Sequence, residues 1–386
     1  MDRKKRFTTG RLTDDIVVQI LSQVPFKSFC RFKCVCKAWL GFSSDQHYRQ
    51  MLPKIPTGLL FGRGSSVQLV RFSPNDEQID GFLTFLPHYE HLEFVDYCNG
   101  LVLCKYNASC TTSSAICRFI VCNPATREWR MLPDTHGSRC ETVLAFDPSW
   151  STQFYVFNLH KKARDSWQPN ICKLEVFSSD LSTWLVDDEW CHPIGVDKPH
   201  IFIGGVLYVQ KSGNGILVLE GWDAMRERIQ PVDFTIKLPA DSYSLMDGCF
   251  GQSSGLLQCA FLEEGGRRVA IWSFNAYLPC KWSLKHRLSM QDAFGRDYFD
   301  RISDPRMFSF GRIYFDRTGD GDMFSWLRGY RILALDLERD VLLLIDREAK
   351  NILSYNISNG KLSEIQYALP SWKYYYYVAC HSKLPG

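Results

Sequence analysis

The hydrophobic pattern changes near residue 58 and divides the chain into two regions. In residues 12–50, apolar side chains recur every three or four positions, which is the period of an amphipathic helix. From residue 58 onwards, the apolar runs are short, β-branched or aromatic, and bounded by Gly, Asn, Asp or Pro, as is typical of strands. We therefore expect an α+β multidomain protein with a small helical domain ahead of an all-β domain.

The first region predicts two main helices. Thr13 can cap the first helix, and the carboxylates of Asp14 and Asp15 suit the positive end of the helix dipole. The apolar stripe of this helix, which Pro25 ends, consists of Ile16, Val17, Ile20, Leu21 and Val24. The second helix begins near Lys27, and its apolar positions are Phe29, Phe32, Val35, Cys36, Trp39 and Leu40.

This helical region carries more apolar surface than short helices can bury among themselves. It is about 40 residues long, and domains of that size usually need a further contact to be stable. The side chains left over are Val18, Phe26, Val35, Cys36 and Trp39. They predict either a surface completed by a partner protein or one that docks on the rest of the chain, and periodicity alone leaves both open.

The β region repeats one pattern. Each unit has a strand led by Gly, a second strand, a polar turn, and a further strand that opens with Trp or Leu. Trp129 and Trp184 are 55 residues apart, and Trp184 and Trp282 are 98 apart, which fits one and two units. Units of about 40–55 residues with several strands each are typical of a β-propeller. We predict six blades, with a seventh allowed, and expect strand 374–380 to pair with the first unit, 58–87, and close the ring.

Composition and charge exclude several classes of protein. The chain has 386 residues, 45% of them hydrophobic and 23% charged, which is typical of a globular protein. Its net charge of +3 is too small for a dedicated nucleic-acid or membrane-surface protein. Residues 1–50 hold 10 basic and 4 acidic side chains, so the basic charge is concentrated ahead of the β region. We expect no membrane-spanning segment and no secretory signal, because no apolar run is long enough.

Cysteine usage favours a reducing compartment. There are 15 cysteines, an odd number with no repeated spacing, and many lie inside apolar runs. Such cysteines behave as small hydrophobic residues. We therefore expect the protein in the nucleus, the cytoplasm or both.

Candidate catalytic and metal motifs lack the context that their chemistry needs. Residues 251–255 match a nucleophile-elbow pattern, but a strand follows instead of a helix, so we predict a hairpin turn there. Residues 316–322 are similar to part of a calcium loop, but Leu327 stands where a bidentate Glu is required. The three cysteines in residues 30–36 lack a second ligand pair for zinc. We expect no catalytic residue, no metal and no cofactor.

Residues 292–326 are the best candidate for a binding segment in the β region. Aromatic residues and arginines are interleaved there, and both types dominate the energetics of protein interfaces. The candidate target contacts are Tyr298, Phe299, Arg301, Arg306 and Phe308. Aspartates in the same segment argue against single-stranded nucleic acid, and ordinary blade strands are the alternative interpretation.

Residues 12–50 resemble an F-box. The matching positions are Leu12, Asp14, Ile16, Ile20-Leu21, Val24-Pro25, Ser28, Arg31-Phe32, Val35-Cys36-Lys37 and Trp39. The segment departs from the family at Thr13, where most members have Pro, although Thr also starts a helix well. Residues 95–133 are similar to the F-box-associated domain of plants, and residues 204–208 are similar to a kelch repeat.

The resemblance implies a basic tail at 1–11, an F-box at 12–51, a linker at 52–57 and a kelch-like propeller at 58–386. It also implies a non-catalytic substrate-recognition subunit of an SCF-type (cullin-RING) ubiquitin ligase, which docks on a Skp-type adaptor and, through it, on cullin. The implied adaptor contacts are Leu12, Ile16, Ile20, Leu21, Pro25, Val35, Cys36 and Trp39. The propeller then holds a target protein, with glycosylated proteins among the candidates, and neither nucleic acid nor membrane.

Two other functions stay open at this point. The propeller can belong to a binding scaffold whose F-box works outside a ligase, and the sequence does not separate this from the ligase role. A propeller enzyme is the second alternative. It requires a cluster of His, Cys or carboxylate side chains with the geometry of a metal site or a catalytic triad.

Overall fold

The structure is a computed structural model. The residues that it describes are 12–22, 35–42, 56–63, 66–71, 80–106, 116–136, 140–161, 171–188, 190, 200–211, 215–220, 232–238, 248–253, 255–263, 268–275, 281–294, 330–336, 340–346, 351–367, 374–380 and 382–384.

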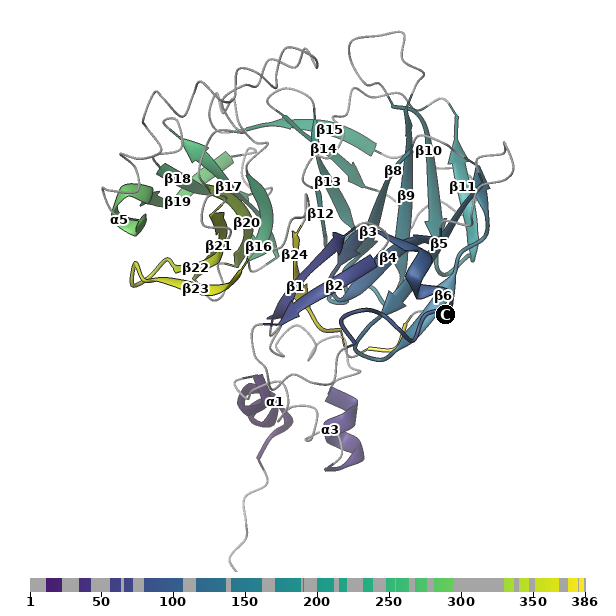
Figure 1. The fold of residues 1–386 in the computed structure, drawn as a ribbon, viewed down its shortest axis with the longest axis horizontal. Coiled ribbons are helices and arrows are strands. Elements are labelled where there is room, and N and C mark those ends of the chain that lie inside the picture. The colour runs from purple at the N-terminus through teal and green to yellow at the C-terminus, as the bar shows by residue number, and fades with distance from the viewer. Residues whose placement is uncertain are drawn as a thin grey trace, which may run out of the picture.

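Two short helices, α1 (Asp14–Ser22) and α3 (Lys37–Phe42), lie outside the ring of sheets (Figure 1). The backbone carbonyl of Thr13 accepts the first helical hydrogen bond of α1, from the amide of Val17 at 3.1 Å. Two aspartates occupy the first turn, where the exposed amide groups of the helix favour negative charge. Helices α1 and α3 confirm the prediction of helices in residues 12–50. The prediction of a second helix that runs through Val35 and Cys36 is wrong, because Val35 lies in a turn and α3 begins only at Lys37.

Within the described residues, the strands form six sheets around a ring, and the β region is a six-bladed propeller (Figure 1). The prediction of six blades is confirmed. Blade 1 contains β24 (Tyr374–Val378), β1 (Pro56–Arg63) and β2 (Ser66–Arg71). Blade 2 follows the short helix η1 (Tyr89–His91) and contains β3 (Leu92–Cys98), β4 (Leu101–Tyr106), β5 (Ile116–Asn123), β6 (Glu128–Met131) and the added β7 (Thr135–His136).

The other four blades are four-stranded antiparallel sheets. Blade 3 contains β8 (Cys140–Phe146), β9 (Phe154–Lys161), β10 (Ile171–Ser178) and β11 (Thr183–Asp187). Blade 4 contains β12 (His200–Ile203), β13 (Val206–Lys211), β14 (Gly215–Glu220) and β15 (Val232–Lys237). Blade 5 contains β16 (Cys249–Ser253), β17 (Leu256–Glu263), β18 (Arg268–Asn275) and β19 (Lys281–Ser289), followed by α5 (Met290–Phe294). Blade 6 contains β20 (Tyr330–Asp336), β21 (Val341–Asp346), β22 (Asn351–Asn356) and β23 (Leu362–Tyr367).

Neighbouring blades meet through their first strands, which form the inner wall of the ring. β3 contacts β8, β12 contacts both β8 and β16, and β20 contacts both β16 and β24. Blade 1 also meets blade 2 through contacts of β1 and β2 with β3. Every blade therefore has a neighbour on each face. This arrangement leaves the middle strands of a blade buried on both sides.

Side-chain alternation divides the middle strands between two cores. In β5, Phe119 and Val121 belong to the cluster shared with blade 3. Ile120 and Cys122 belong to the cluster shared with blade 1. Successive side chains of a strand point to opposite faces. A middle strand that is covered on both faces therefore needs a continuous run of apolar residues.

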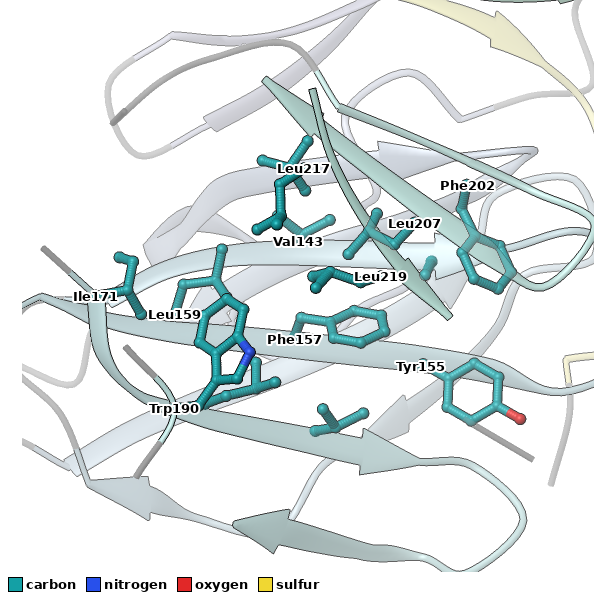
Figure 2. Close-up of a cluster of buried hydrophobic side chains, with 14 residues drawn as sticks. Val143, Tyr155, Phe157, Leu159, Ile171, Trp190, Phe202, Leu207, Leu217 and Leu219 are labelled. Carbon is teal, nitrogen blue, oxygen red and sulfur yellow. The ribbon is translucent and has the colours of Figure 1, made fainter. Parts of the chain in front are cut away.

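Figure 2 shows one of these cores, between blades 3 and 4. Tyr155, Phe157 and Leu159 of β9 pack there with side chains from the facing strands of blade 4, namely Phe202, Leu207, Leu217 and Leu219. Phe157 and Leu207 are 0% exposed. Burying one such side chain contributes about 1.5–3 kcal/mol, so the interfaces between blades hold the domain together.

The carboxyl-terminal strand closes the ring, as the sequence predicted. β24 pairs antiparallel with β1, and Leu60 lies opposite Tyr375 in the register. The Tyr97 hydroxyl of blade 2 donates to the carbonyl of Val378 at 3.1 Å and accepts from its amide at 2.7 Å. Burial raises the pKa of Tyr97, so its hydroxyl keeps the proton that the first of these bonds needs.

The segment after β24 is fixed to blade 2. The side-chain amide of Asn123 donates to the carbonyls of Cys380 and Ser382, both at 2.9 Å. The amide of Leu384 donates to Glu128 at 2.6 Å. At Gly100, with φ of 95°, an added Cβ atom lies 2.4 Å from the Cβ atom of Cys380, so only glycine fits there. Residues 374–384 thus join blade 1 to blade 2.

The repeated tryptophans connect the outer strands of successive blades. The indole NH of Trp184 on β11 donates to the carbonyl of Pro133 at 2.9 Å, just beyond the outer strand of blade 2. In the same way, Trp282 on β19 donates to the carbonyl of Lys237 on β15 at 2.8 Å. The Trp that opens the last strand of these units is therefore a contact between blades.

Candidate functional site

The two helices share a small core. Val17, Val18 and Leu21 of α1 pack with Phe42 of α3, and Trp39 packs against this cluster while partly exposed. Val18 is 0% exposed and Leu21 is 1% exposed. The expectation that Val18 is left over is therefore wrong, because α3 supplies the apolar neighbour that periodicity could not identify.

Five large apolar side chains in and beside the two helices are open to solvent. Ile16 and Ile20 are four residues apart, a spacing that places them on one side of α1, and Leu12 lies two residues before the helix begins. We call the following set the open apolar face: Leu12 (59% exposed), Ile16 (44%), Ile20 (50%), Val35 (62%) and Leu40 (50%). A cluster of exposed large apolar side chains is typical of an interaction surface.

Most of the predicted adaptor contacts that the structure describes are accessible. Cys36 is exposed, in addition to Leu12, Ile16, Ile20 and Val35, and Trp39 is half-buried. Leu21 differs from the prediction: at 1% exposure its side chain belongs to the helix core, so its effect on a partner is indirect. Pro25 lies outside the described residues. Leu40 joins the face although the sequence reasoning did not select it; its signal was its place in the second apolar stripe.

The predicted target contacts cannot be placed on the propeller. Tyr298, Phe299, Arg301, Arg306 and Phe308 lie outside the described residues, as does the calcium-like segment 316–322. The nucleophile-elbow pattern at 251–255 is a hairpin, with Ser253 on β16 paired to Leu256 on β17, as predicted. Within the residues described, His, Cys, Asp and Glu form no group of three or more that could hold a metal ion.

A buried polar cluster that the sequence reasoning missed lies between blades 2 and 3. We call Thr135, His160, Lys173 and Glu175 the polar junction. Glu175 accepts a hydrogen bond from the Thr135 hydroxyl at 2.6 Å, and its carboxylate lies 2.9 Å from His160 Nε2 and 3.0 Å from Lys173 Nζ. The only signal in the sequence was an acidic residue within an apolar strand, Leu174-Glu-Val-Phe177.

The polar junction stabilises the ionised form of Glu175. Burial opposes ionisation of this carboxyl group, but hydrogen bonds from His160, Thr135 and Lys173 outweigh it and lower its pKa to about 2. Paired buried charge of this kind fixes how two elements meet, here β7 of blade 2 against β9 and β10 of blade 3.

A second buried carboxylate connects the inner strands of three blades. Asp96 on β3 accepts a hydrogen bond from the amide of Leu144 on β8 at 2.7 Å. The same oxygen lies 3.0 Å from Nε2 of His200 on β12. Asp96 is 0% exposed, and these contacts align blades 2, 3 and 4 at the wall of the ring.

Comparison with known proteins identifies the helical region. The F-box domain family matches residues 10–50, so the chain contains an F-box domain there. No helix in the described part of the chain has the length and apolar character needed to cross a membrane.

The chain is also similar to F-box proteins of Arabidopsis thaliana. F-box protein At5g07610 is 28% identical over 187 residues, which cover 44% of each chain. F-box protein At5g49610 is 30% identical over 138 residues, 35% of each chain. The chain thus spans less than half the length of these curated relatives. F-box protein At5g18160 is 22% identical over 301 residues, covering 70% of this chain and 72% of that one.

Among solved structures, a chain of a nidogen/laminin complex aligns with a TM-score of 0.40 and 12% identity, covering 81% of this chain and 93% of that one.

Proposed function

We propose that this protein is the substrate-recognition subunit of an SCF-type (cullin-RING) ubiquitin ligase. In this proposal the F-box docks on a Skp-type adaptor and, through it, on cullin, while the propeller holds a target protein for ubiquitination. The observation that carries the proposal is the open apolar face, which the described chain leaves uncovered within a domain that matches the F-box family. The nucleus and the cytoplasm are the proposed locations.

The physical reason for docking is the burial of the open apolar face. Each large apolar side chain that moves from water into an interface contributes about 1.5–3 kcal/mol when it is buried completely. The half-buried Trp39 packs against the helix core and, where it is exposed, offers the aromatic type that dominates interface energies. The neighbouring Lys37 is exposed, and a cation at the rim speeds encounter with an acidic adaptor more than it tightens binding.

The role of the propeller is to bring a target close to the ubiquitin donor. Holding two reactants together raises their effective concentration, so a recognition subunit accelerates transfer without a bond-making group of its own. The proposal therefore requires a rigid propeller and an F-box that stays bound to the adaptor. It assigns no catalytic side chain to this chain.

The docking step is tested by binding of the full chain to a purified Skp-type adaptor. The double variant Ile16→Asp/Ile20→Asp removes two members of the open apolar face without touching the helix core. We expect binding about 100-fold weaker, or about 2.8 kcal/mol, with an unchanged melting temperature. Val186→Asp is the matched control, because Val186 is 47% exposed on β11, far along the chain from the F-box. Equal binding by the double variant and the wild type contradicts the proposal.

The ligase step is tested by capturing target proteins from native tissue while the proteasome is blocked. Targets that accumulate on the propeller and become more abundant when the protein is depleted support the ligase role. Captured proteins whose abundance stays constant on depletion contradict it and indicate a scaffold instead.

A further inference from the structure

Two cysteines from different blades meet beside the polar junction. Cys117 lies near the start of β5 in blade 2, opposite Thr135 in the strand register, and is 3% exposed. Cys140 is the first residue of β8 in blade 3, opposite His160, and is partly exposed. Both are reduced in the structure. The strand registers therefore bring the two cysteines to the same edge of the contact between blades.

The two thiols lie within hydrogen-bonding reach of each other. A hydrogen bond joins the sulfur atoms of Cys117 and Cys140, and the ammonium group of Lys105 on β4 also bonds Cys117. The sulfur of Cys140 lies 3.6 Å from the hydroxyl of Thr142. Further ionisable groups of this region include His160, Lys173 and Glu175 of the polar junction, and Asp188, which pairs with Lys173. Cys117 thus has both a neighbouring thiol and a neighbouring cation.

These contacts shift the pKa values of the two thiols in opposite directions. The hydrogen bond from Cys140 outweighs burial and, with the nearby Lys105, lowers the pKa of Cys117 to about 6. The same hydrogen bond, together with burial, raises the pKa of Cys140. These contacts favour a thiolate at Cys117 and a thiol at Cys140, which is the combination that a peroxide-reactive cysteine and its resolving partner require.

Other buried cysteines of the propeller lack this environment. Cys104 on β4 and Cys259 on β17 are 0% exposed, and burial alone raises the pKa of Cys104. Burial also dominates at Cys259, whose pKa is raised as well. Such thiols stay protonated and are inert toward peroxide, so they serve as references within the same molecule.

We propose that Cys117 and Cys140 form a redox site that hydrogen peroxide converts into a disulfide between blades 2 and 3. The thiolate sulfur of Cys117 attacks one oxygen of the peroxide, the O–O bond breaks, and the released hydroxide takes a proton to become water. Cys117 is then a sulfenic acid. The sulfur of Cys140 attacks the sulfur of Cys117, the S–O bond breaks, and the hydroxide combines with the proton of Cys140 to give a second water. Both sulfur atoms are oxidised, and both peroxide oxygens are reduced.

Hydrogen peroxide suits this site because it is small and neutral. Cys117 is almost covered, which disfavours bulky thiol reagents, while the partial exposure of Cys140 places the pair at the edge of the interface. The product connects β5 to β8 covalently, at the point where Thr135 and Glu175 already connect the same two blades by a hydrogen bond. The site is independent of adaptor docking, which uses the helix pair.

The test treats the purified full chain with hydrogen peroxide and maps its cysteines by mass spectrometry. We expect an intact mass lower by two hydrogen atoms, a peptide pair joined through Cys117 and Cys140, and full reversal by dithiothreitol. Oxidation of Cys117 should be slower at acidic than at neutral pH, and at neutral pH more than tenfold faster than that of Cys104 or Cys259. Equal rates at all these cysteines overturn the proposal, and so does a disulfide from Cys117 to any other cysteine.

Three variants separate the two steps. Cys140→Ser should leave Cys117 as a sulfenic acid that dimedone traps, whereas Cys117→Ser should abolish the mass loss. Cys172→Ser is the matched control, since Cys172 is also partly exposed and contacts the backbone carbonyl of His160 at 3.5 Å. It should form the cross-link at the wild-type rate. A cross-link that survives in Cys117→Ser, or that needs Cys172, overturns the assignment; if a serine variant does not fold, the comparison of cysteines within the wild type decides.

Discussion

In the propeller, Phe119 and Val121 face one neighbouring blade and Ile120 and Cys122 face the other, whereas on α1 the side chains of Ile16 and Ile20 face solvent. Both regions have apolar residues in the periodic pattern of their secondary structure. The propeller surrounds each blade with two others, but the helix pair has one small core and nothing in the described chain over its second face. A periodic apolar pattern therefore predicts which side of a helix or strand is apolar. Whether another part of the chain packs on that side depends on the tertiary structure.

The largest expected effect comes from removing β24 and the residues after it, which close the ring. Deletion of residues 374–386 removes β24, the fully buried Tyr377 and the contacts of Asn123 with the last residues. We expect loss of cooperative unfolding and rapid proteolysis of the propeller, because blades 1, 2 and 6 all lose a neighbour. Thermal unfolding and limited proteolysis measure this, and deletion of residues 385–386 alone is the control. A propeller that still unfolds cooperatively without β24 contradicts the proposed closure.

Adjacent residues of α1 offer a sharper comparison between covered and open positions. Leu21→Ala creates a cavity in the helix core, and we expect the F-box to lose about 2–5 kcal/mol of stability. Ile20→Ala, whose side chain is 50% exposed, should change stability by less than about 0.5 kcal/mol. Hydrogen exchange of α1 amides in the full chain measures both. Adaptor binding should fall in both variants, through unfolding in the first and through a lost contact in the second.

The polar junction predicts a pH dependence of the stability of the propeller. The pKa of Glu175 is about 2 in the folded state against an ordinary value of 4.5, so the folded state favours its ionised form. The stability that ionised Glu175 contributes is complete when the pH is above its ordinary pKa. It is lost as the pH falls through the pKa of the folded state. Between these two pKa values we expect the free energy of unfolding of the wild type to fall by about 1–3 kcal/mol because of this carboxylate.

Glu175→Gln should remove that part of the pH dependence and lower stability at neutral pH by the same amount. Denaturant unfolding at several pH values measures it. Glu93→Gln, at an exposed position on β3, controls for the loss of one negative charge. A wild-type curve that coincides with that of Glu175→Gln at every pH would show that the junction contributes nothing.

The smallest expected effects concern the outer tryptophans. Trp184→Phe and Trp282→Phe each remove one indole hydrogen bond to the preceding blade, and we expect losses of about 0.5–1.5 kcal/mol. Trp129 occupies the corresponding place on β6 and is 42% exposed, so Trp129→Phe should be close to neutral. Melting temperatures of the three variants make the comparison. Three equal shifts would show that the rings act through packing rather than through the hydrogen bonds.

Features encoded locally could be predicted from the sequence. The strand units, the turn between β16 and β17, and the closing strand at 374–380 each depend on a short run of residues and its flanking turns. The exposure of Ile16 and Ile20 also followed from local spacing, because a four-residue step keeps side chains on one side of a helix.

Features that depend on distant partners could not be predicted. Val18 and Leu21 are covered by Phe42, which lies on another helix. The polar junction unites Thr135, His160 and Glu175 from β7, β9 and β10, and none of these residues has a local signal that identifies the others. The pairing of Cys117 with Cys140 depends in the same way on how blade 3 is placed against blade 2.

The anchoring of residues 380–384 by Asn123 and Glu128 has a consequence for synthesis in the cell. A ribosome delivers blade 2 long before it delivers these residues. Until this segment has been translated, blade 1 lacks the pairing of β1 with β24, and blade 2 lacks the hydrogen bonds of Asn123 and Glu128. A transcript with a premature stop codon ahead of this segment yields a ring that cannot shut, which makes the open blades a target for chaperones and degradation.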